Sequence, residues 1–234
     1  MKLRAWIEKG PFTLSLSSGF FGFFAHAGFM RTLLAEGYAP SAYRGCSAGA
    51  IVAAFMASGR TTQELEDLLR GIRREDFWDV KPGLGLLRGE KFHSLLQKEI
   101  KPRFADLQKP LGVSVFDITR ARTRILNSGE LPRAVHASCA VPLMFQPVRL
   151  QKSFLWDGGM FDPLAIAEHP PDERILVHDI SNKIYFGKTP TVSHLPRARS
   201  LRLKNIPQSG PHKLGNAVEI MNFTAAATRQ ALLE

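Results

Sequence analysis

Gly45-Cys46-Ser47-Ala48-Gly49-Ala50 decides the fold, because it places a serine between two glycines where a strand pattern changes into a helix pattern. Residues 41–44 can form a short strand, and residues 51–56 are typical of a buried helix. This context predicts a nucleophile elbow, a sharp turn that lifts the hydroxyl of Ser47 into a cleft. Gly45 and Gly49 would let strand and helix pass closely, and the helix N-terminus would favour negative charge there. The same small residues also fit an ordinary tight turn.

The composition indicates a globular α/β protein. A chain of 234 residues, 44% of them hydrophobic, can build one full core but is short for two enzyme domains, so we expect a single domain over residues 1–234. Cys46 and Cys139 form neither a disulfide framework nor a zinc motif, and we expect no metal and no cofactor. Residues 1–6 lack signal-peptide features and no window reaches the length of a membrane span, which favours a cytoplasmic location.

The chain carries a formal net charge of +10, with basic residues crowded into its last third. An anionic membrane surface is one partner that this charge could attract, and a solvated face without a partner is the alternative. The sequence has no zinc finger, RNA-binding aromatic signature or recognition helix, so we expect no nucleic-acid partner. The basic residues concerned are Lys183, Lys188, Arg197, Arg199, Arg202, Lys204 and Lys213.

Strand and helix patterns alternate along the chain, which predicts a three-layer α/β/α fold with a mainly parallel central sheet. The expected strands are residues 12–17, 41–44, 111–118, 122–127, 154–156 and 174–180. The expected helices are residues 25–36, the elbow helix to about residue 58, and residues 63–70, 89–101, 131–138 and 217–233.

Two further motifs bear on chemistry. Asp157-Gly158-Gly159 follows an expected strand and offers a carboxylate that another backbone can approach closely, although Asp-Gly is also a common hairpin turn. Ser17-Ser18-Gly19-Phe20-Phe21-Gly22 lies between the first strand and the first helix, where backbone N–H groups can converge on an anion. It also fits an ordinary loop, with the phenylalanines at 20, 21, 23 and 24 lining a core or a cleft.

In this order, the three motifs resemble those of the patatin-like phospholipases. The segments 85–92, 137–148 and 157–164 look similar to the corresponding family segments, so the resemblance extends from about residue 12 to residue 180. It implies a Ser–Asp dyad without a histidine and a lipid or acyl-ester substrate. Ser47 would be the nucleophile that forms an acyl-serine, and Asp157 the base that first takes the serine proton and then activates water. Burial is expected to raise the pKa of Asp157.

The oxyanion loop departs from the family pattern Gly-x-Gly-x-x-Gly. Ser17 replaces the first glycine, Gly19 and Gly22 match the other two, and Phe21 stands where an arginine is usual. The backbone N–H groups of Gly19 and Phe20 remain candidates for the oxyanion hole.

Two other functions stay open. An α/β-hydrolase would use a Ser–Asp–His triad with a late histidine such as His178, His194 or His212. Because the oxyanion loop is altered, a catalytically weak lipid-binding or regulatory protein of the same fold is the second. His26 is expected to be a packing or capping residue, and His136 is assigned no role.

Overall fold

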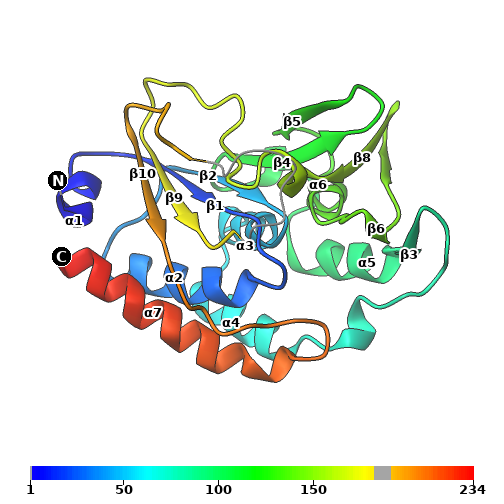
Figure 1. Ribbon diagram of the computed structural model, residues 1–234, viewed down its shortest axis with the longest axis horizontal. Helices are drawn as coiled ribbons and strands as arrows, with labels where there is room; N and C mark the ends of the chain where they lie inside the picture. The colour runs from blue at the N-terminus through cyan, green and yellow to red at the C-terminus, as the bar shows by residue number, and fades with distance from the viewer. Residues whose placement is uncertain (1, 182–190) are drawn as a thin grey trace.

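A central sheet organises the computed structural model of the chain, which describes residues 2–181 and 191–234 (Figure 1). Its strands are β1 (Thr13–Leu16), β2 (Ala42–Cys46), β4 (Leu111–Asp117), β5 (Arg122–Leu126), β7 (Val148–Leu150), β8 (Ser153–Asp157), β9 (Ile175–Asp179) and β10 (Ala198–Arg202). The order is β10-β9-β1-β2-β4-β8-β7, and β5 pairs with β4. Pairs from β10 to β4 are parallel, whereas those of β5, β8 and β7 are antiparallel. The sheet is therefore mixed but mostly parallel.

Helices flank this sheet in the three-layer α/β/α arrangement that the sequence predicts. The elbow helix α3 packs against β1, β2 and β4, α6 packs against β4, β7 and β8, and α2 packs against α4 and α7. The helices are α1 (Leu3–Ile7), α2 (Phe23–Ala35), α3 (Ala48–Ala57), α4 (Thr62–Gly71), α5 (Glu90–Glu99), α6 (Leu131–Ser138) and α7 (Ala217–Leu233). No helix in residues 2–181 or 191–234 is both long and apolar enough to cross a membrane.

Strand β4 brings the ends of β2 and β8 together. Strand β5 pairs with one edge of β4, and two strands share the other edge. The first part of this shared edge pairs with β2, where Ser114 faces Cys46, and the last part pairs with β8, where Val115 faces Asp157. Because Ser114 and Val115 are neighbours in the chain, the C-terminal ends of β2 and β8 meet at one point of the sheet. The residues that follow Cys46 and Asp157 therefore start from the same place.

Local signals explain where several helices begin and end. Helix α4 begins with a capping box, in which Thr61 Oγ1 accepts a 3.2 Å hydrogen bond from Glu64 N–H and the Glu64 carboxylate accepts a 2.8 Å one from Thr61 N–H. Helix α2 begins two residues earlier than predicted, at Phe23, and Gly37 follows its end with φ of +82°.

Some short elements escaped the sequence patterns: α1, β7, β10 and the small parallel pair β3 (Gly85–Leu87) and β6 (Leu143–Phe145). Strand β10 shows the reason, since it lies at the sheet edge and buries only its first residue, Ala198. Its other four residues, including Arg199 and Arg202, are half-buried or exposed, so the strand lacks the run of apolar residues by which a buried strand is recognised.

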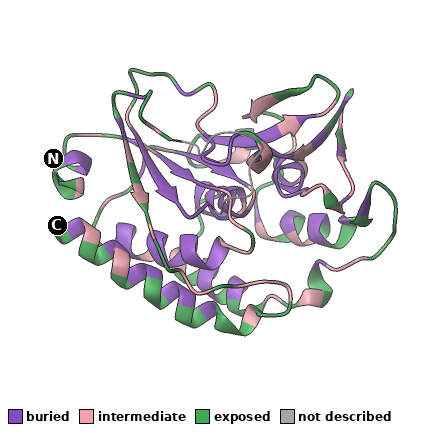
Figure 2. Ribbon diagram, viewed as in Figure 1, coloured by how far each residue is buried: buried purple, intermediate pink, exposed green. Residues whose placement is uncertain are grey.

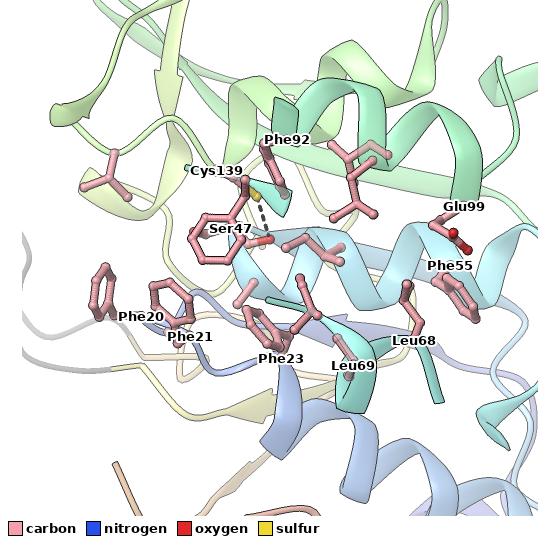
Figure 3. A pocket seen from close by; sticks show the side chains of 18 of the residues that line it. Phe20, Phe21, Phe23, Ser47, Phe55, Leu68, Leu69, Phe92, Glu99 and Cys139 are labelled. Carbon is pink, nitrogen blue, oxygen red and sulfur yellow. Dashed lines mark hydrogen bonds between the residues drawn. The ribbon is translucent and has the colours of Figure 1, made fainter. Parts of the chain in front are cut away.

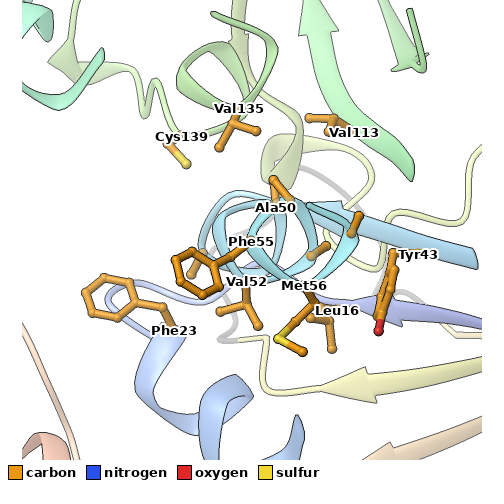
Figure 4. Packing of buried hydrophobic residues seen from close by; sticks show 14 of the residues in the cluster. Leu16, Phe23, Tyr43, Ala50, Val52, Phe55, Met56, Val113, Val135 and Cys139 are labelled. Carbon is orange, nitrogen blue, oxygen red and sulfur yellow. The ribbon is translucent and has the colours of Figure 1, made fainter. Parts of the chain in front are cut away.

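The core gathers around α3 and the parallel strands. Figure 2 shows purple, buried ribbon along β1, β9 and α3, while α7 alternates between buried and exposed residues. Figure 4 shows Val52 and Phe55 of α3 pointing toward Phe23 and Leu16, and Val135 lying on the opposite side of the helix. The elbow helix is therefore held by apolar contacts on several sides.

The close crossing of α2 and α7 predicts a measurable stability effect. A Cβ added at Gly28 would lie 2.2 Å from the Met221 carbonyl oxygen, so Gly28→Ala must push the helices apart. We expect a loss of about 1–3 kcal/mol in the free energy of unfolding, measured by urea denaturation. Gly71→Ala is the matched control, because nothing lies within 4 Å of the added methyl group. Equal stability of the two variants would contradict the tight crossing.

Candidate active site

Ser47 occupies a strained turn between β2 and α3. It is the N-cap residue of α3 and has φ of +53° and ψ of −121°, a conformation that costs a non-glycine residue about 1–3 kcal/mol. A Cβ at Gly45 would lie 2.6 Å from Ala50 Cα, and a Cβ at Gly49 would lie 2.0 Å from the Leu16 carbonyl oxygen. Both glycines are therefore required by close backbone approach, and the turn has the geometry of a nucleophile elbow.

Two small side chains hold the backbone of this turn, and the sequence analysis did not identify their role. Ser47 N–H donates a 2.9 Å hydrogen bond to Ser138 Oγ, which in turn donates a 2.6 Å hydrogen bond to the carbonyl of Ser114. Cys139 Sγ lies 3.3 Å from the Ser47 carbonyl oxygen and donates to it. Ser138 thus ties the elbow to β4, a contact that no spacing in the sequence predicts.

Asp157 ends β8, is almost fully buried and precedes a 3₁₀ turn at Gly158–Met160. Its Oδ1 accepts a 2.7 Å hydrogen bond from Gly159 N–H and a 3.7 Å contact from Cys46 Sγ. Burial raises the pKa of Asp157 to about 6, while the Ser47 side chain, the Gly159 N–H group and the Cys46 thiol act in the opposite direction by hydrogen bonding. The carboxylate is thus a stronger base than an exposed aspartate and remains ionised at neutral pH.

A second buried aspartate, Asp162, fixes the chain that follows Asp157. Its carboxylate accepts hydrogen bonds from Ser114 Oγ at 2.8 Å and from Ile166 N–H at 2.9 Å. Arg44, on β2, donates a 2.7 Å hydrogen bond to the carbonyl of Ala165 in the same loop. The sequence motif contains Asp162, but nothing in the pattern distinguishes it from a surface acid.

The loop proposed for the oxyanion hole lies beside this segment, since Ser18 N–H donates a 2.7 Å hydrogen bond to the Pro163 carbonyl. Within the loop, Gly22 N–H donates to Gly19 O at 2.8 Å. The N–H groups of Gly19 and Phe20 donate to no residue within 2–181 or 191–234. Both residues line the same pocket as Ser47. Phe21 adopts φ of +54°.

Gly159 also approaches this loop, because a Cβ added to it would lie 3.0 Å from Ser18 Cβ and from Asp157 Oδ1. A Cβ at Gly158 would lie 2.6 Å from the Ser114 backbone. The Asp-Gly-Gly motif therefore packs against both β4 and the oxyanion loop rather than forming a hairpin turn.

Two buried histidines support the start of that loop. His26 Nε2 lies 2.8 Å from the Ser17 carbonyl oxygen and must donate to it, so its Nδ1 accepts from His178 Nδ1 at 2.8 Å. Burial lowers the pKa of His26 to about 4 and lowers that of His178, so both are neutral at physiological pH. His178 also stacks on Phe29, with ring centroids 4.0 Å apart. His26 is a packing residue, as expected, and also a hydrogen-bonding one.

An apolar pocket of about 100 Å³ opens beside Ser47 (Figure 3). Phe20, Phe21 and Phe23 line it on one side and Phe92 on the other, whereas Phe24 is fully buried in the core. Glu99 lies at the end away from Ser47 and pairs with Arg60 at 3.2 Å. The pocket offers a hydrocarbon chain an apolar environment that begins at the serine hydroxyl.

A family model described as Patatin-like phospholipase matches residues 14–168. An uncharacterized NTE family protein of Mycobacterium tuberculosis is 28% identical over 158 residues, which cover 66% of this chain and 44% of that protein. Triacylglycerol lipase ptl2 of Schizosaccharomyces pombe is 24% identical over 237 residues, which cover 94% of this chain and 35% of that protein. The chain thus spans less than half the length of these two relatives.

Among solved structures, VipD from Legionella pneumophila superimposes with a TM-score of 0.67 at 15% sequence identity, covering 95% of this chain and 66% of that one. This similarity concerns the fold alone and agrees with the α/β/α architecture described above. Because the family model matches more than half of the residues and includes both the elbow and the Asp-Gly-Gly motif, the chain belongs to the patatin-like phospholipase family.

Proposed function

We propose that the protein is a lipid acyl hydrolase that uses Ser47 as nucleophile and Asp157 as general base. The observation that carries this proposal is the buried carboxylate of Asp157 at the point where β4 brings the ends of β2 and β8 together, with a pKa that burial raises to about 6. A base with a pKa near the working pH is favourable for proton transfer. Lipid acyl hydrolysis also agrees with the family and with the name of the Schizosaccharomyces pombe relative, a triacylglycerol lipase.

In the proposed reaction, the Ser47 hydroxyl passes its proton to Asp157 while its oxygen attacks the ester carbonyl. The carbonyl oxygen becomes an oxyanion, which the N–H groups of Gly19 and Phe20 can stabilise, together with the N–H of Ala48, which has no partner within its helix. The alcohol leaves with the proton from Asp157, and an acyl-serine remains. Asp157 then takes a proton from water, the resulting hydroxide attacks the acyl group, and the fatty acid leaves as Ser47 regains its proton.

The triad alternative receives little support from the geometry. His178 is fully buried and hydrogen-bonds to His26, while His194 and His212 are exposed. None of the three lines the pocket that contains Ser47. The catalytically weak alternative rests on the missing arginine of the oxyanion loop. The N–H groups of Gly19 and Phe20, which donate to no residue that the structure describes, argue against it.

Membrane association and cellular location belong to this proposal. Both cysteines are free thiols, which supports a cytoplasmic location. The basic residues of the last third that the structure describes could hold the protein at an anionic membrane surface, since Arg197, Lys204 and Lys213 are exposed. Lys183 and Lys188 lie outside the described residues.

Covalent catalysis predicts labelling of one serine. A fluorophosphonate probe should modify the wild-type protein at Ser47, and Ser47→Ala should abolish the labelling because the nucleophile is gone. Mass spectrometry of the labelled peptide identifies the site. Ser41→Ala is a control outside the pocket and should be labelled like the wild type. Undiminished labelling of Ser47→Ala, or modification of Cys46, would show that the assignment is wrong.

The base assignment predicts a large loss of turnover. Asp157→Asn keeps the side-chain shape but removes the proton acceptor, so kcat for a short-chain nitrophenyl ester should fall at least about a hundredfold. His194→Ala and His212→Ala should each keep most of the activity, because both side chains are exposed and neither lines the pocket. If either histidine variant lost as much activity as Asp157→Asn, a triad would replace the dyad.

The raised pKa of Asp157 sets the pH dependence. The ionised carboxylate is the active form, so kcat/KM should rise with pH through a single-proton limb centred near 6 and then level off. Burial is the main cause of the raised pKa, and the buried His26, with a pKa of about 4, cannot produce this limb. Initial rates between pH 4.5 and 8 measure it. A profile that is flat between pH 5 and 7 would exclude Asp157 as the titrating base.

A further inference from the structure

A second pocket, of about 540 Å³, is lined by Gly19, Phe20 and Gly22 of the oxyanion loop and shares the first two of these with the apolar pocket. We call it the basic pocket. Its apolar members come from α2, from the residue after β9, from the segment after β10 and from α7, namely Ala25, Ile180, Leu203, Ile206, Pro207 and Ile220. Its polar members come from Ser181 and from the segment that begins at the end of β10, namely Arg202, Lys204, Asn205, Gln208 and Ser209. The described lining residues include no aspartate or glutamate.

The charges of this pocket do not cancel. Arg202 pairs with the buried carboxylate of Asp179, at 3.5 Å between Nη1 and Oδ2. Lys204 makes no ion pair or hydrogen bond with any residue in the described ranges. One pocket cation is therefore neutralised and the other is left for a ligand. An unpaired ammonium group in a concave site favours an anion over a neutral or cationic group.

Neutral donors accompany this cation. The hydroxyl groups of Ser181 and Ser209 are already engaged, with Asp179 and with the Phe21 carbonyl respectively. The side-chain amides of Asn205 and Gln208 make no hydrogen bond to any residue that the structure describes, so their N–H groups can turn toward a bound oxygen. A lysine with two amide donors suits the oxygens of a phosphate group.

The Ser209 contact also explains how the basic pocket is joined to the catalytic loop. Ser209 Oγ donates a 2.8 Å hydrogen bond to the carbonyl of Phe21, so the segment after β10 is attached directly to the oxyanion loop. The apolar pocket with Ser47 and the basic pocket with Lys204 share Gly19 and Phe20 as lining residues, so the two pockets adjoin each other at this loop. One ester molecule could therefore occupy both pockets, with its acyl chain in the apolar pocket and an anionic group of its alcohol part in the basic pocket.

We infer that the basic pocket binds the anionic phosphate head group of a glycerophospholipid whose acyl chain enters the apolar pocket. This inference rests on the proposed function and narrows it to a substrate class. A head group such as phosphoglycerol brings a phosphate without a cation, whereas phosphocholine adds a quaternary ammonium that Lys204 repels. The protein should therefore prefer anionic over zwitterionic phospholipids with the same acyl chains.

Binding to the Ser47→Ala protein tests the inference without turnover. Dihexanoyl phosphatidylglycerol and dihexanoyl phosphatidylcholine, both kept below their micelle concentrations, are titrated by calorimetry. We expect about tenfold tighter binding of the anionic lipid, the ratio that one hydrogen bond to a charged group supplies. Lys204→Glu in the same background should remove this preference. Lys213→Glu is the matched control, because Lys213 lies in the same segment and is exposed like Lys204 but does not line the pocket, and it should retain the preference.

The control separates the pocket from the overall positive charge, since both variants change the net charge equally. The inference would be overturned if Lys204→Glu and Lys213→Glu reduced the preference for the anionic lipid equally. It would also be overturned if the Ser47→Ala protein with an unaltered basic pocket bound both lipids equally tightly. Glycerol 3-phosphate alone distinguishes a free phosphate ligand from a lipid, and binding as tight as that of the anionic lipid would also overturn it. Hydrolysis of a nitrophenyl ester by the wild-type protein reports on the proposed function separately.

Discussion

The pairing of one strand with two others is the constraint on which the site depends. Strand β4 places Ser114 opposite Cys46 and Val115 opposite Asp157, so residues more than a hundred positions apart in sequence start from adjacent points. Ser114 then contributes twice more, since its carbonyl accepts from Ser138 and its hydroxyl donates to Asp162. A slip of β4 by one residue would turn these groups to the opposite face and separate the elbow from its carboxylate.

Burial raises the pKa of the carboxylate at the point where the ends of β2 and β8 meet. Asp157 has few polar neighbours besides Gly159, Cys46 and Ser47, and its pKa rises because the ionised form loses its water. The same exclusion of water strengthens any hydrogen bond to charge that develops beside Ser47. The strained conformation of Ser47 persists because the surrounding structure fixes the turn. Gly45 and Gly49 allow neighbouring backbone to pack closely against it, and Ser47 N–H is hydrogen-bonded to Ser138 Oγ.

The oxyanion loop separates two different environments. Phenylalanines and leucines surround the pocket that contains Ser47, whereas the basic pocket adds a lysine, an arginine and two side-chain amides to its apolar lining. Hydrogen bonds hold the loop at three points. Ser18 N–H donates to the Pro163 carbonyl, and Ser209 Oγ donates to the Phe21 carbonyl. At the start of the loop, the Ser17 carbonyl accepts from His26, which is itself paired with His178. Phe21, which stands where the family pattern usually has an arginine, takes part in one of these contacts through its carbonyl group.

The sequence by itself determined the fold class, the family and the identity of Ser47 and Asp157 as candidate site residues, because glycine-bounded motifs and alternating apolar runs are local patterns. It also predicted most long elements, with small errors at their ends. It could not predict β10, whose edge position leaves only Ala198 buried, or the roles of Ser114, Ser138 and Asp162. Those roles arise from contacts between residues far apart in the chain. The raised pKa of Asp157, the buried histidine pair and the basic pocket likewise depend on burial and packing, which only the tertiary structure decides.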